Sequence, residues 1–348
     1  MTHVTKVGVQ HIRNHALKVV APSRASTIIT GKNGTGKTSL IEALYVALQG
    51  SSFRGSDSDI LQRGESWYRI DIEMSDGSVR TVKFDSSKQT GRKQFLIDGK
   101  IAYRLSPAHK HPVVLFEPED MRMINGSPVR RRHFVDHFIS QINPLYGQSL
   151  RKYERALKQR NNLLKRPTTT ADELFVWNVA LSEYGAYIVL ERTMVLEKIN
   201  QLITPIYQTI SRTTDVVGIH YSHTLVDNIQ QKLMSELTKN ADKDKFLGYT
   251  TTGPHRDDIL VSYNNSPADT TASRGENRSI ILALKQIEAD IIYELTDKKP
   301  ILLLDDVFSE LDEERQYNIT LGTYQTIITT TEPTKPNRSN KGVSYIQI

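Results

Sequence analysis

Short apolar runs near both ends of the chain predict buried β-strands. They cover residues 27–30, 113–116, 259–263, 300–304 and 326–331. Alternating apolar positions at 68–74 and 79–84, joined by Asp76 and Gly77, predict an antiparallel pair, and a further strand is expected at 95–97. These patterns predict an α/β domain that carries an antiparallel β layer beside its main sheet.

The middle of the chain shows helical periodicity instead. A seven-residue apolar repeat predicts one long helix that packs against others, and its positions are Leu174, Leu181, Ile188, Val195 and Leu202. Further helices are expected at 143–165 and 226–239, with Pro167 and Pro205 separating the helices. The repeat covers four heptads at most, which favours a compact helical lobe over a long coiled coil.

The best-defined chemical motif directly follows the first of these strands. Residues 31–38 read GKNGTGKT, and a helical pattern begins at Thr38. In such a loop the glycines let backbone N–H groups face phosphate oxygens, and the helix N-terminus adds partial positive charge. We expect Lys37 to reach the β and γ phosphates and Thr38 to ligate Mg²⁺. The predicted nucleotide contacts are Gly31, Lys32, Asn33, Gly34, Thr35, Gly36, Lys37 and Thr38.

A second candidate site lies far downstream, where the apolar strand 300–304 ends in Asp305 and Asp306. We expect Asp305 to hold Mg²⁺ through water and Asp306 to orient the water that attacks the γ-phosphate. With Lys37, these two carboxylates are the predicted catalytic residues, and Thr38 and Asp305 are the predicted metal ligands. The alternatives are a glycine turn that happens to contain a lysine and a buried strand capped by a polar turn.

Length and composition set the remaining limits. The 348 residues exceed what one core holds, so we expect a head of residues 1–124 and 246–348 with an inserted helical lobe at 125–245. No apolar run approaches the roughly 20 residues of a membrane span, and the first ten residues lack a signal-peptide pattern. The absence of cysteine excludes disulfides and thiolate metal sites. A cytoplasmic location is therefore expected.

The net charge is +6, and basic residues are concentrated where the helical lobe begins. We predict a sequence-nonspecific DNA surface there, because basic side chains neutralise backbone phosphates without reading bases. Its predicted members are Arg130, Arg131, Arg132, Arg151, Lys152, Arg155 and Lys158, and the basic run continues through Arg160, Lys165 and Arg166. Two alternatives stay open: a solvated helix face, and pairing of Arg131 and Arg132 with carboxylates of the lobe.

The segment 253–258, GPHRDD, is harder to interpret from chemistry alone. We expect it to cap the strand at 259–263. A metal or nucleophilic site built on His255 and Asp257 lacks supporting ligands. Residues 117–120, which follow the strand at 113–116, are expected to line the nucleotide pocket.

Several segments in order resemble ABC-type ATPases and, more narrowly, the RecF family of bacterial DNA repair proteins. They are GKNGTGKT, FEPEDMRMINGSPVRRRHFVD, GYTTTGPHRDD, a Ser-x-Gly segment at Ser273 and Gly275, and PILLLDDVFSELDEER. The resemblance covers most of residues 1–160 and 246–330. It implies an SMC/Rad50-like head that forms an ATP-induced homodimer around two ATP molecules and clamps DNA.

The resemblance also assigns residues and partners. Ser273 and Gly275 would contact the γ-phosphate bound to the partner copy, and Asp312 would lie at the dimer seam. The implied role is gap repair, replication restart and SOS induction on gapped DNA or strand junctions, with a weak DNA-stimulated ATPase acting as a switch. The implied partners are the mediator proteins RecR and RecO.

Two positions depart from the family pattern. Glu276 replaces a Gln in the Ser-x-Gly segment, which is expected to place a carboxylate near phosphates and weaken dimerisation. The strand at 326–331 carries Thr where many ABC ATPases have a γ-phosphate-sensing His, so we expect slow hydrolysis. A non-hydrolysing scaffold and a small-molecule phosphotransferase are the competing functions.

Overall fold

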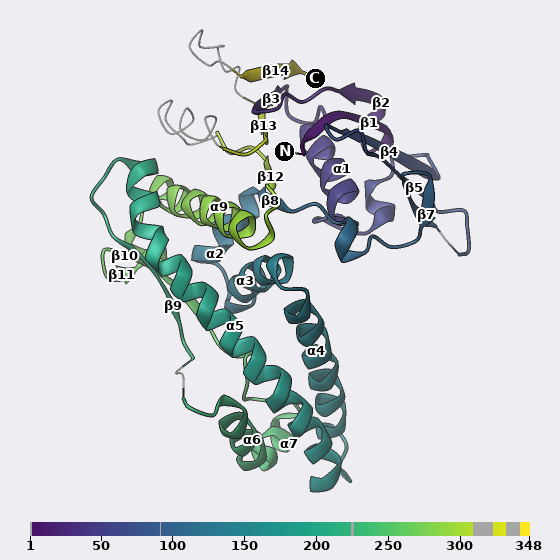
Figure 1. Ribbon diagram of the computed structural model, residues 1–348. Helices are drawn as coiled ribbons and strands as arrows, with labels where there is room; N and C mark the ends of the chain where they lie inside the picture. Colours follow the sequence, from purple (N-terminus) through teal and green to yellow (C-terminus); the bar gives the residue numbers. More distant parts are fainter. Residues whose placement is uncertain (1, 91, 224–225, 309–322, 332–341) are drawn as a thin grey trace. The chain divides into compact units, whose positions relative to one another are not determined.

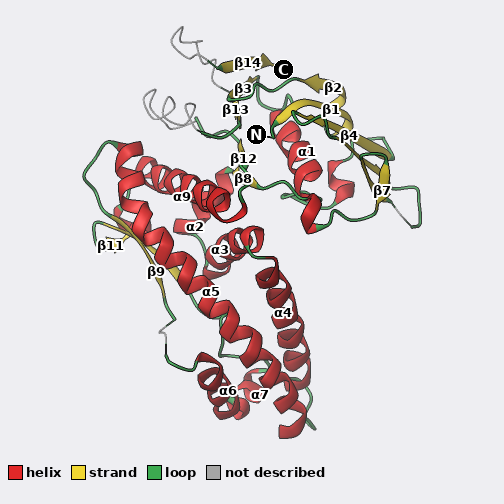
Figure 2. Cartoon of the chain, in the orientation of Figure 1, coloured by secondary structure: helices red, strands yellow, loops and turns green. Residues whose placement is uncertain are grey.

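The computed structural model describes residues 2–90, 92–223, 226–308, 323–331 and 342–348. The chain divides into two compact units, which we call the sheet unit (residues 1–119 and 288–348) and the helical unit (residues 120–287). Figure 1 labels their elements, and Figure 2 shows that most strands belong to the first unit and most long helices to the second. Among the described residues, no helix is both long enough and apolar enough to cross a membrane.

The sheet unit contains two sheets with helix α1 (Lys37–Gln49) between them. The five-stranded sheet is parallel in the order β14-β3-β13-β12-β8, and the six-stranded sheet is antiparallel in the order β2-β1-β4-β5-β6-β7. The parallel strands are β3 (Ser26–Thr30), β8 (Val113–Phe116), β12 (Ile301–Leu304), β13 (Thr326–Thr330) and β14 (Val343–Gln347). The antiparallel strands are β1 (Val4–Ile12), β2 (His15–Val20), β4 (Trp67–Met74), β5 (Val79–Asp85), β6 (Lys93–Ile97) and β7 (Lys100–Ala102). Short 3₁₀ turns cover Asp57–Ile60, Pro107–His109 and Pro118–Met121.

Burial patterns explain why these segments form strands. In β12 all four residues are buried, as expected for a parallel strand covered on both faces. In β4 the buried residues alternate, with Tyr68, Ile70 and Ile72 directed toward α1 and the core. The predicted α/β head with an antiparallel layer is therefore confirmed.

The helical unit is built around α5 (Ala171–Ser211), a helix of 41 residues. A capping box between Thr170 and Glu173 starts it, because each side chain satisfies a backbone N–H group that the helix leaves free. The other helices are α2 (Arg122–Asn125), α3 (Pro128–Ile142), α4 (Pro144–Leu164), α6 (Ile229–Lys239), α7 (Ala241–Leu247), α8 (Ala268–Thr271) and α9 (Arg274–Thr296), which continues into the sheet unit. Strands β9 (Val217–Tyr221), β10 (Ile259–Tyr263) and β11 (Ser266–Pro267) form a small antiparallel sheet.

The predicted seven-residue repeat describes only the first half of α5. Leu174, Leu181 and Ile188 are buried, but the buried positions then move by one residue to Val189, Leu196 and Ile203. The shift follows from the 3.6-residue turn of a straight helix, which drifts away from a strict heptad. Val195 and Leu202 are only partly buried, so this part of the prediction was wrong.

Pro205 does not end α5 as predicted; the helix continues to Ser211. Contacts with β9 hold the part of the helix that directly precedes the proline. Asn200 and Thr204 hydrogen-bond to the backbone of Ile219 and Val217, respectively. These tertiary contacts offset the hydrogen bond that a proline removes from a helix.

The boundary between the units also differs from the one expected, because residues 246–287 pack with the helical unit. Arg160 is one reason. Its fully buried guanidinium donates to Asp244 at 2.7 Å, to Asn178 at 2.7 Å and to Thr250 at 2.9 Å, and so joins α4, α5 and α7 to the segment after them. A buried cation needs such complete pairing, which holds this segment on the helical unit.

The segment 253–258 makes polar contacts with four neighbouring elements. Asp258 pairs with Arg131 of α3, Asp257 accepts a hydrogen bond from Tyr221 of β9, and the Pro254 carbonyl accepts one from Arg192 of α5. His255 accepts a hydrogen bond from the Tyr153 hydroxyl of α4 at its Nδ1, while its Nε2 donates to the Thr250 carbonyl. The segment thus joins α3, α4, α5 and β9, a larger structural role than the strand cap expected for it.

The buried His255 predicts an acid-sensitive fold. Burial lowers the pKa of His255 from 6.5 to about 4, so below pH 6.5 the unfolded chain gains a proton that the folded chain does not. Stability should therefore fall as pH drops from 6.5 toward 4, by about 1.4 kcal/mol per pH unit for this group. Urea unfolding across this range should show a shallower pH slope for His255→Gln than for the parent. The exposed His220→Gln variant is the control, and an unchanged slope in His255→Gln would contradict the assignment.

Candidate nucleotide-binding site

The phosphate loop connects β3 to α1 and uses two glycines in the left-handed region, with φ of 82° at Gly34 and 95° at Gly36. Gly36 is the N-cap of α1, so the helix N-terminus faces the loop. The Lys37 ammonium donates to the carbonyls of Gly31 at 2.7 Å and Lys32 at 2.9 Å. Lys37 is therefore held within the loop, at the place where phosphate oxygens would compete with those carbonyls.

The turn between β1 and β2 contributes two loop contacts that sequence reasoning missed. Asn14 donates through its Nδ2 to the Gly34 carbonyl, and His15 contacts the Gly36 carbonyl through its Nε2 at 3.0 Å. A Cβ on Gly36 would lie 2.3 Å from His15 Nε2, so only glycine fits there. No sequence pattern signals these contacts, because they depend on the hairpin that pairs Ile12 with His15.

The structure brings Thr38 and Asp305 together although they are 267 residues apart. The Thr38 hydroxyl lies 2.8 Å and 2.9 Å from the two Asp305 carboxylate oxygens, and the Thr329 hydroxyl donates to Oδ1 at 2.6 Å. Thr329 Oγ1 also accepts the backbone N–H of Asp306 at 3.1 Å. Asp306 has a φ of 49°, a strained conformation of the kind that clusters at functional sites. Thr329 of β13 thus contacts both aspartates, one at its carboxylate and the other at its backbone.

Arg54 is a further site residue that was not predicted. Its Nη2 lies 2.9 Å from Asp305 Oδ2, and its Nε lies 3.7 Å from Glu117 Oε2. Glu117 therefore lies beside Arg54, whereas Asp120 pairs with Lys285 in the helical unit, and the expectation that residues 117–120 line the nucleotide pocket stays a prediction. The guanidinium supplies the positive charge that a nearly buried carboxylate such as Asp305 requires.

The oxygen donors at this position fit the metal expected from sequence. Mg²⁺ in phosphate-binding enzymes is held by one or two carboxylates or hydroxyls together with phosphates and water. Asp305 and Thr38 supply such oxygens directly beside the phosphate loop. Both side chains would hold the ion, and Arg54 would have to leave Asp305 Oδ2 for it to bind there.

Ser273, Gly275 and Glu276 lie at the start of α9 in the helical unit. Ser273 is exposed, and its hydroxyl accepts the backbone N–H of Glu276 at 3.3 Å, so within this chain Ser273 acts as the N-cap of α9. A contact with a partner's nucleotide stays a prediction. Asp312 lies outside the described residues.

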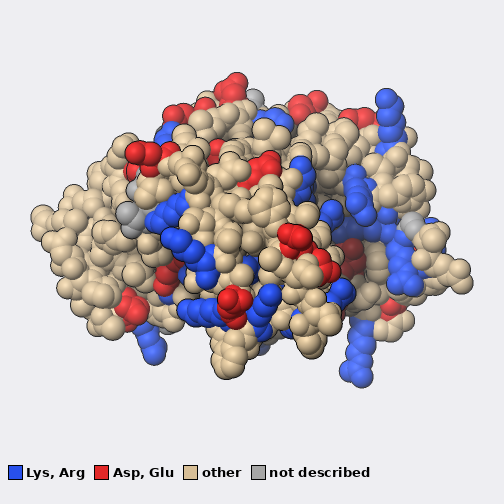
Figure 3. Space-filling model, turned by 90° about the horizontal axis from the view of Figure 1, so that it is seen from below, with Lys and Arg blue, Asp and Glu red and all other residues tan. Residues whose placement is uncertain are grey.

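Two arginines of the predicted DNA surface, and Arg160 of the basic run that continues from it, are engaged within the protein. Arg131 is buried and pairs through two nitrogens with Asp258, Arg132 donates to the Asp257 carbonyl, and Arg160 is fully buried. These residues maintain the fold, so they are removed from the predicted surface. The exposed members are Arg130, Arg151, Lys152, Arg155 and Lys158. On the face shown in Figure 3, Lys and Arg side chains form several groups with acidic side chains between them.

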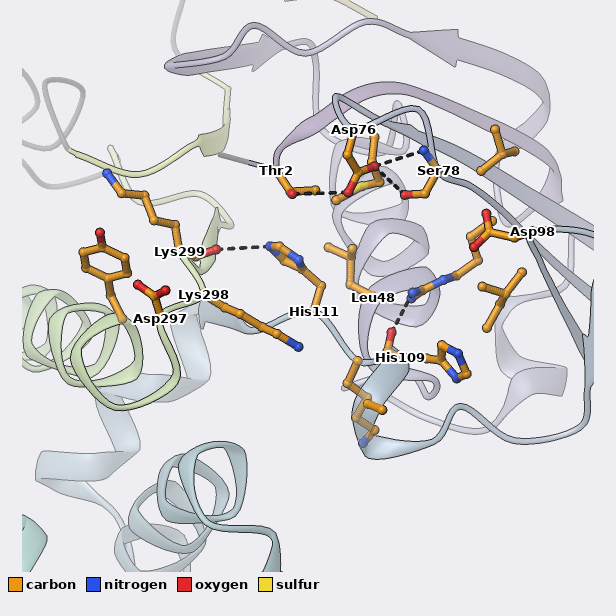
Figure 4. A pocket seen from close by; sticks show the side chains of 17 residues that line it. Thr2, Leu48, Asp76, Ser78, Asp98, His109, His111, Asp297, Lys298 and Lys299 are labelled. Atoms are coloured by element: carbon orange, nitrogen blue, oxygen red, sulfur yellow. Dashed lines mark hydrogen bonds between the residues drawn. The ribbon is translucent and has the colours of Figure 1, made fainter.

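A separate cavity of about 540 Å³ lies in the sheet unit, beside the end of α1 and the segment that precedes β12 (Figure 4). Burial lowers the pKa of its His111 to about 4, and the His111 Nε2 donates to the Lys299 carbonyl at 3.1 Å. Arg80 donates to the carbonyls of Ala47 and His109. These contacts join neighbouring segments, and no residue of the phosphate loop lines the cavity.

The fold is that of an ABC-ATPase-like P-loop head. The sequence pattern of the family described as "AAA domain" matches residues 6–328. An Smc head domain with an extended coiled coil from Pyrococcus furiosus has a similar fold, with a TM-score of 0.54 at 15% identity over 95% of this chain and 90% of that one.

Closer similarity identifies the family. The chain is 36% identical to the DNA replication and repair protein RecF of Streptococcus suis over 94% of its length and 92% of the relative's. It is 32% identical to that of Natranaerobius thermophilus, covering 94% and 91%. A solved structure described as the recombination mediator protein RecF-ATP in the RecFOR pathway has a TM-score of 0.84 at 30% identity, covering 97% of this chain and 94% of that one. The chain belongs to the RecF family of DNA replication and repair proteins.

The Gly36 geometry predicts a severe effect of a single methyl group. Gly36→Ala should reduce ATP affinity by more than about tenfold, because the new Cβ would strike His15 and displace the loop carbonyl. Isothermal titration with ATP measures this. Gly34→Ala is the matched control, since its φ is also positive but nothing lies within 4 Å of its Cβ. An equal loss of ATP affinity in the two variants would show that backbone strain alone causes the loss, and that the contact with His15 contributes nothing to it.

Proposed function

We propose that this chain binds Mg²⁺–ATP and DNA and acts as an ATP-gated clamp in DNA replication and repair. The observation that carries the proposal is the convergence of Thr38, Arg54 and Thr329 on the Asp305 carboxylate beside the phosphate loop. Any nearly buried carboxylate needs donors. This one also lies beside the phosphate loop and the first turn of α1, where a nucleotide site needs a carboxylate that is fixed before a metal–phosphate complex binds.

Each residue of the site has a role in this proposal. The loop N–H groups and Lys37 bind the phosphates, and Mg²⁺, when bound, supplies charge that neutralises phosphate oxygens. Thr38 and Asp305 hold the ion, while Thr329 orients both aspartates. Asp306 accepts a hydrogen bond from the attacking water and aligns it with the γ-phosphorus. Hydrolysis is slow because the strand that ends at this site offers a threonine rather than a histidine.

The proposed assembly is a homodimer around two ATP molecules, with Ser273 and Gly275 of one copy contacting the γ-phosphate held by the other. The RecF family relationship and the similar RecF-ATP structure support nucleotide binding, on which this arrangement rests. By the same similarity, the chain would work with RecR and RecO in gap repair and SOS induction. A small-molecule phosphotransferase is disfavoured because the RecF family relationship covers nearly the whole chain.

The proposed DNA surface is the exposed basic face of α4. It also includes Arg130 of the preceding helix, α3. Arg151, Lys152, Arg155 and Lys158 are exposed on consecutive turns of α4, while Tyr153, Ala156 and Arg160 face inward. This spacing presents cations along one helix side without any base-reading geometry. The surface should therefore bind the DNA backbone independently of sequence.

A non-hydrolysing scaffold is the second candidate function, and the strand at 326–331 favours it, because it offers threonines rather than a γ-phosphate-sensing histidine and its Thr329 hydroxyl is already bonded to Asp305. Two variants separate it from the clamp. Lys37→Arg should abolish ATP-induced dimerisation, since the loop loses its phosphate ligand. Asp306→Asn should retain the dimer but lower turnover by on the order of a hundredfold. Sedimentation with ATP and phosphate release measure the two properties. An equally low turnover in parent and Asp306→Asn protein would favour the scaffold.

The DNA surface predicts a defined change in salt dependence. Replacing Arg151, Arg155 and Lys158 by Ala should lower duplex affinity by more than about tenfold and reduce the salt slope by about one per residue. Fluorescence anisotropy between 50 and about 200 mM salt measures both quantities. Lys239→Ala with Lys243→Ala is the matched control, because these exposed lysines lie on α6 and α7, outside the proposed surface. An unchanged affinity in the triple variant would exclude this face of α4.

A further inference from the structure

The carboxylate of Glu276 is held by two donors at the start of α9. Its Oε2 accepts the backbone N–H of Ser273 at 2.6 Å, and its Oε1 accepts the Tyr263 hydroxyl at 3.0 Å. In return, the Ser273 hydroxyl accepts the backbone N–H of Glu276 at 3.3 Å. These contacts form a capping box with an additional tyrosine donor, and we call the three residues the Glu276 cap.

Tyr263 is itself firmly positioned. It is 7% exposed on β10, and its ring packs edge-on against Tyr207 of α5, with the ring centres 6.1 Å apart. The next residue, Asn264, donates to Asp215 at 2.8 Å and accepts the Val216 backbone N–H at 2.9 Å. The Tyr263 hydroxyl therefore connects the start of α9 to the junction of α5, β9 and β10.

The contacts also account for the charge of Glu276. The Ser273 backbone N–H, followed by the Ser273 and Tyr263 hydroxyls, lowers the pKa of this carboxyl. The partial positive charge of a helix N-terminus acts in the same direction. A carboxylate satisfied in this way is directed at its own helix turn and at β10. The sequence-based expectation of simple repulsion between Glu276 and phosphates assumed a free carboxylate.

We propose that Glu276 and Tyr263 are positioning residues, which fix Ser273 and the first turn of α9 in the conformation that contacts the γ-phosphate held by a second copy of the chain. The inference rests on the proposed ATP-induced dimer and names the residues that prepare one half of its shared site. It reverses the sign expected from sequence: Glu276 supports dimerisation. Its pairing with Tyr263 also explains why a glutamate is suitable at this position, since both carboxylate oxygens accept hydrogen bonds.

Truncating the carboxylate distinguishes positioning from repulsion, because the two predict opposite signs. Glu276→Ala removes both the charge and the cap. Positioning predicts ATP-dependent dimerisation weakened by about tenfold, since a charge-assisted hydrogen bond is lost at each shared site. Repulsion predicts a tighter dimer. Tyr263→Phe should also weaken the dimer. The double variant should lose less dimer affinity than the sum of the losses in the two single variants, because both substitutions remove the same hydrogen bond.

The conservative variant tests the hydrogen-bond geometry. In Glu276→Gln the amide oxygen can accept the Ser273 N–H while the amide nitrogen donates to the Tyr263 oxygen. The affinity of the ATP-dependent dimer should therefore stay within about threefold of that of the parent. If Glu276 instead repels the phosphates, removing its charge should strengthen the dimer. Glu294→Ala, an exposed position on the same helix, is the matched control. ATP affinity of the monomer, measured below the dimerisation concentration, should be unchanged in every variant.

A second measurement keeps the inference separate from the proposed dimer. Amide hydrogen exchange of Ser273 to Asn277 in the ATP-free protein should be faster in Glu276→Ala and Tyr263→Phe than in the parent and Glu294→Ala. Unchanged exchange would overturn the Glu276 cap whatever the assembly state. A parent chain that stays monomeric with ATP would contradict the proposed function, and with it the role of the cap in dimerisation. A tighter dimer in Glu276→Ala would overturn the inference alone.

Discussion

The candidate site depends on one buried carboxylate, that of Asp305. Removing such a group from water is costly unless donors replace the lost hydration. Thr38, Arg54 and Thr329 provide those donors, and they come from the first turn of α1, the segment after α1 and strand β13. The need to satisfy one charge therefore brings together segments up to 291 residues apart in sequence, from Thr38 to Thr329. The parallel pairing of β12 with β13 sets the register that makes this possible.

The sequence was sufficient to predict the local parts of the fold. Strand β12, the start of α1 and helix α4 have strong local patterns, and the structure places them within a few residues of the predicted ranges. Thr38 and Asp305 could also be predicted to meet, because the phosphate loop and the apolar strand ending in aspartates occur together in one class of ATPase. Arg54, Asn14 and His15 carry no such signal, since their contacts arise only from the fold.

The errors in the helical unit have a common physical origin. A basic run in the sequence gives no information about which side chains turn inward, and Arg131 and Arg160 turn inward to meet Asp258 and Asp244. Both acidic partners lie over 80 residues away in sequence, so local charge counting could not find them. The same long-range contacts explain why residues 246–287 belong to the helical unit.

The departures from the family pattern acquire a different meaning once their partners are known. The threonines of β13 suggest only a missing histidine when the sequence is considered alone, but in the structure Thr329 donates to the Asp305 carboxylate and accepts the backbone N–H of Asp306. Glu276, taken alone, is an unfavourable charge, but with Tyr263 it is a satisfied helix cap. In both cases the chemical effect of the side chain is set by the donors and acceptors that face it. A substitution in a nucleotide site should therefore be judged together with its hydrogen-bond partners, because the partners determine whether a charge opposes the ligand or organises the surrounding backbone.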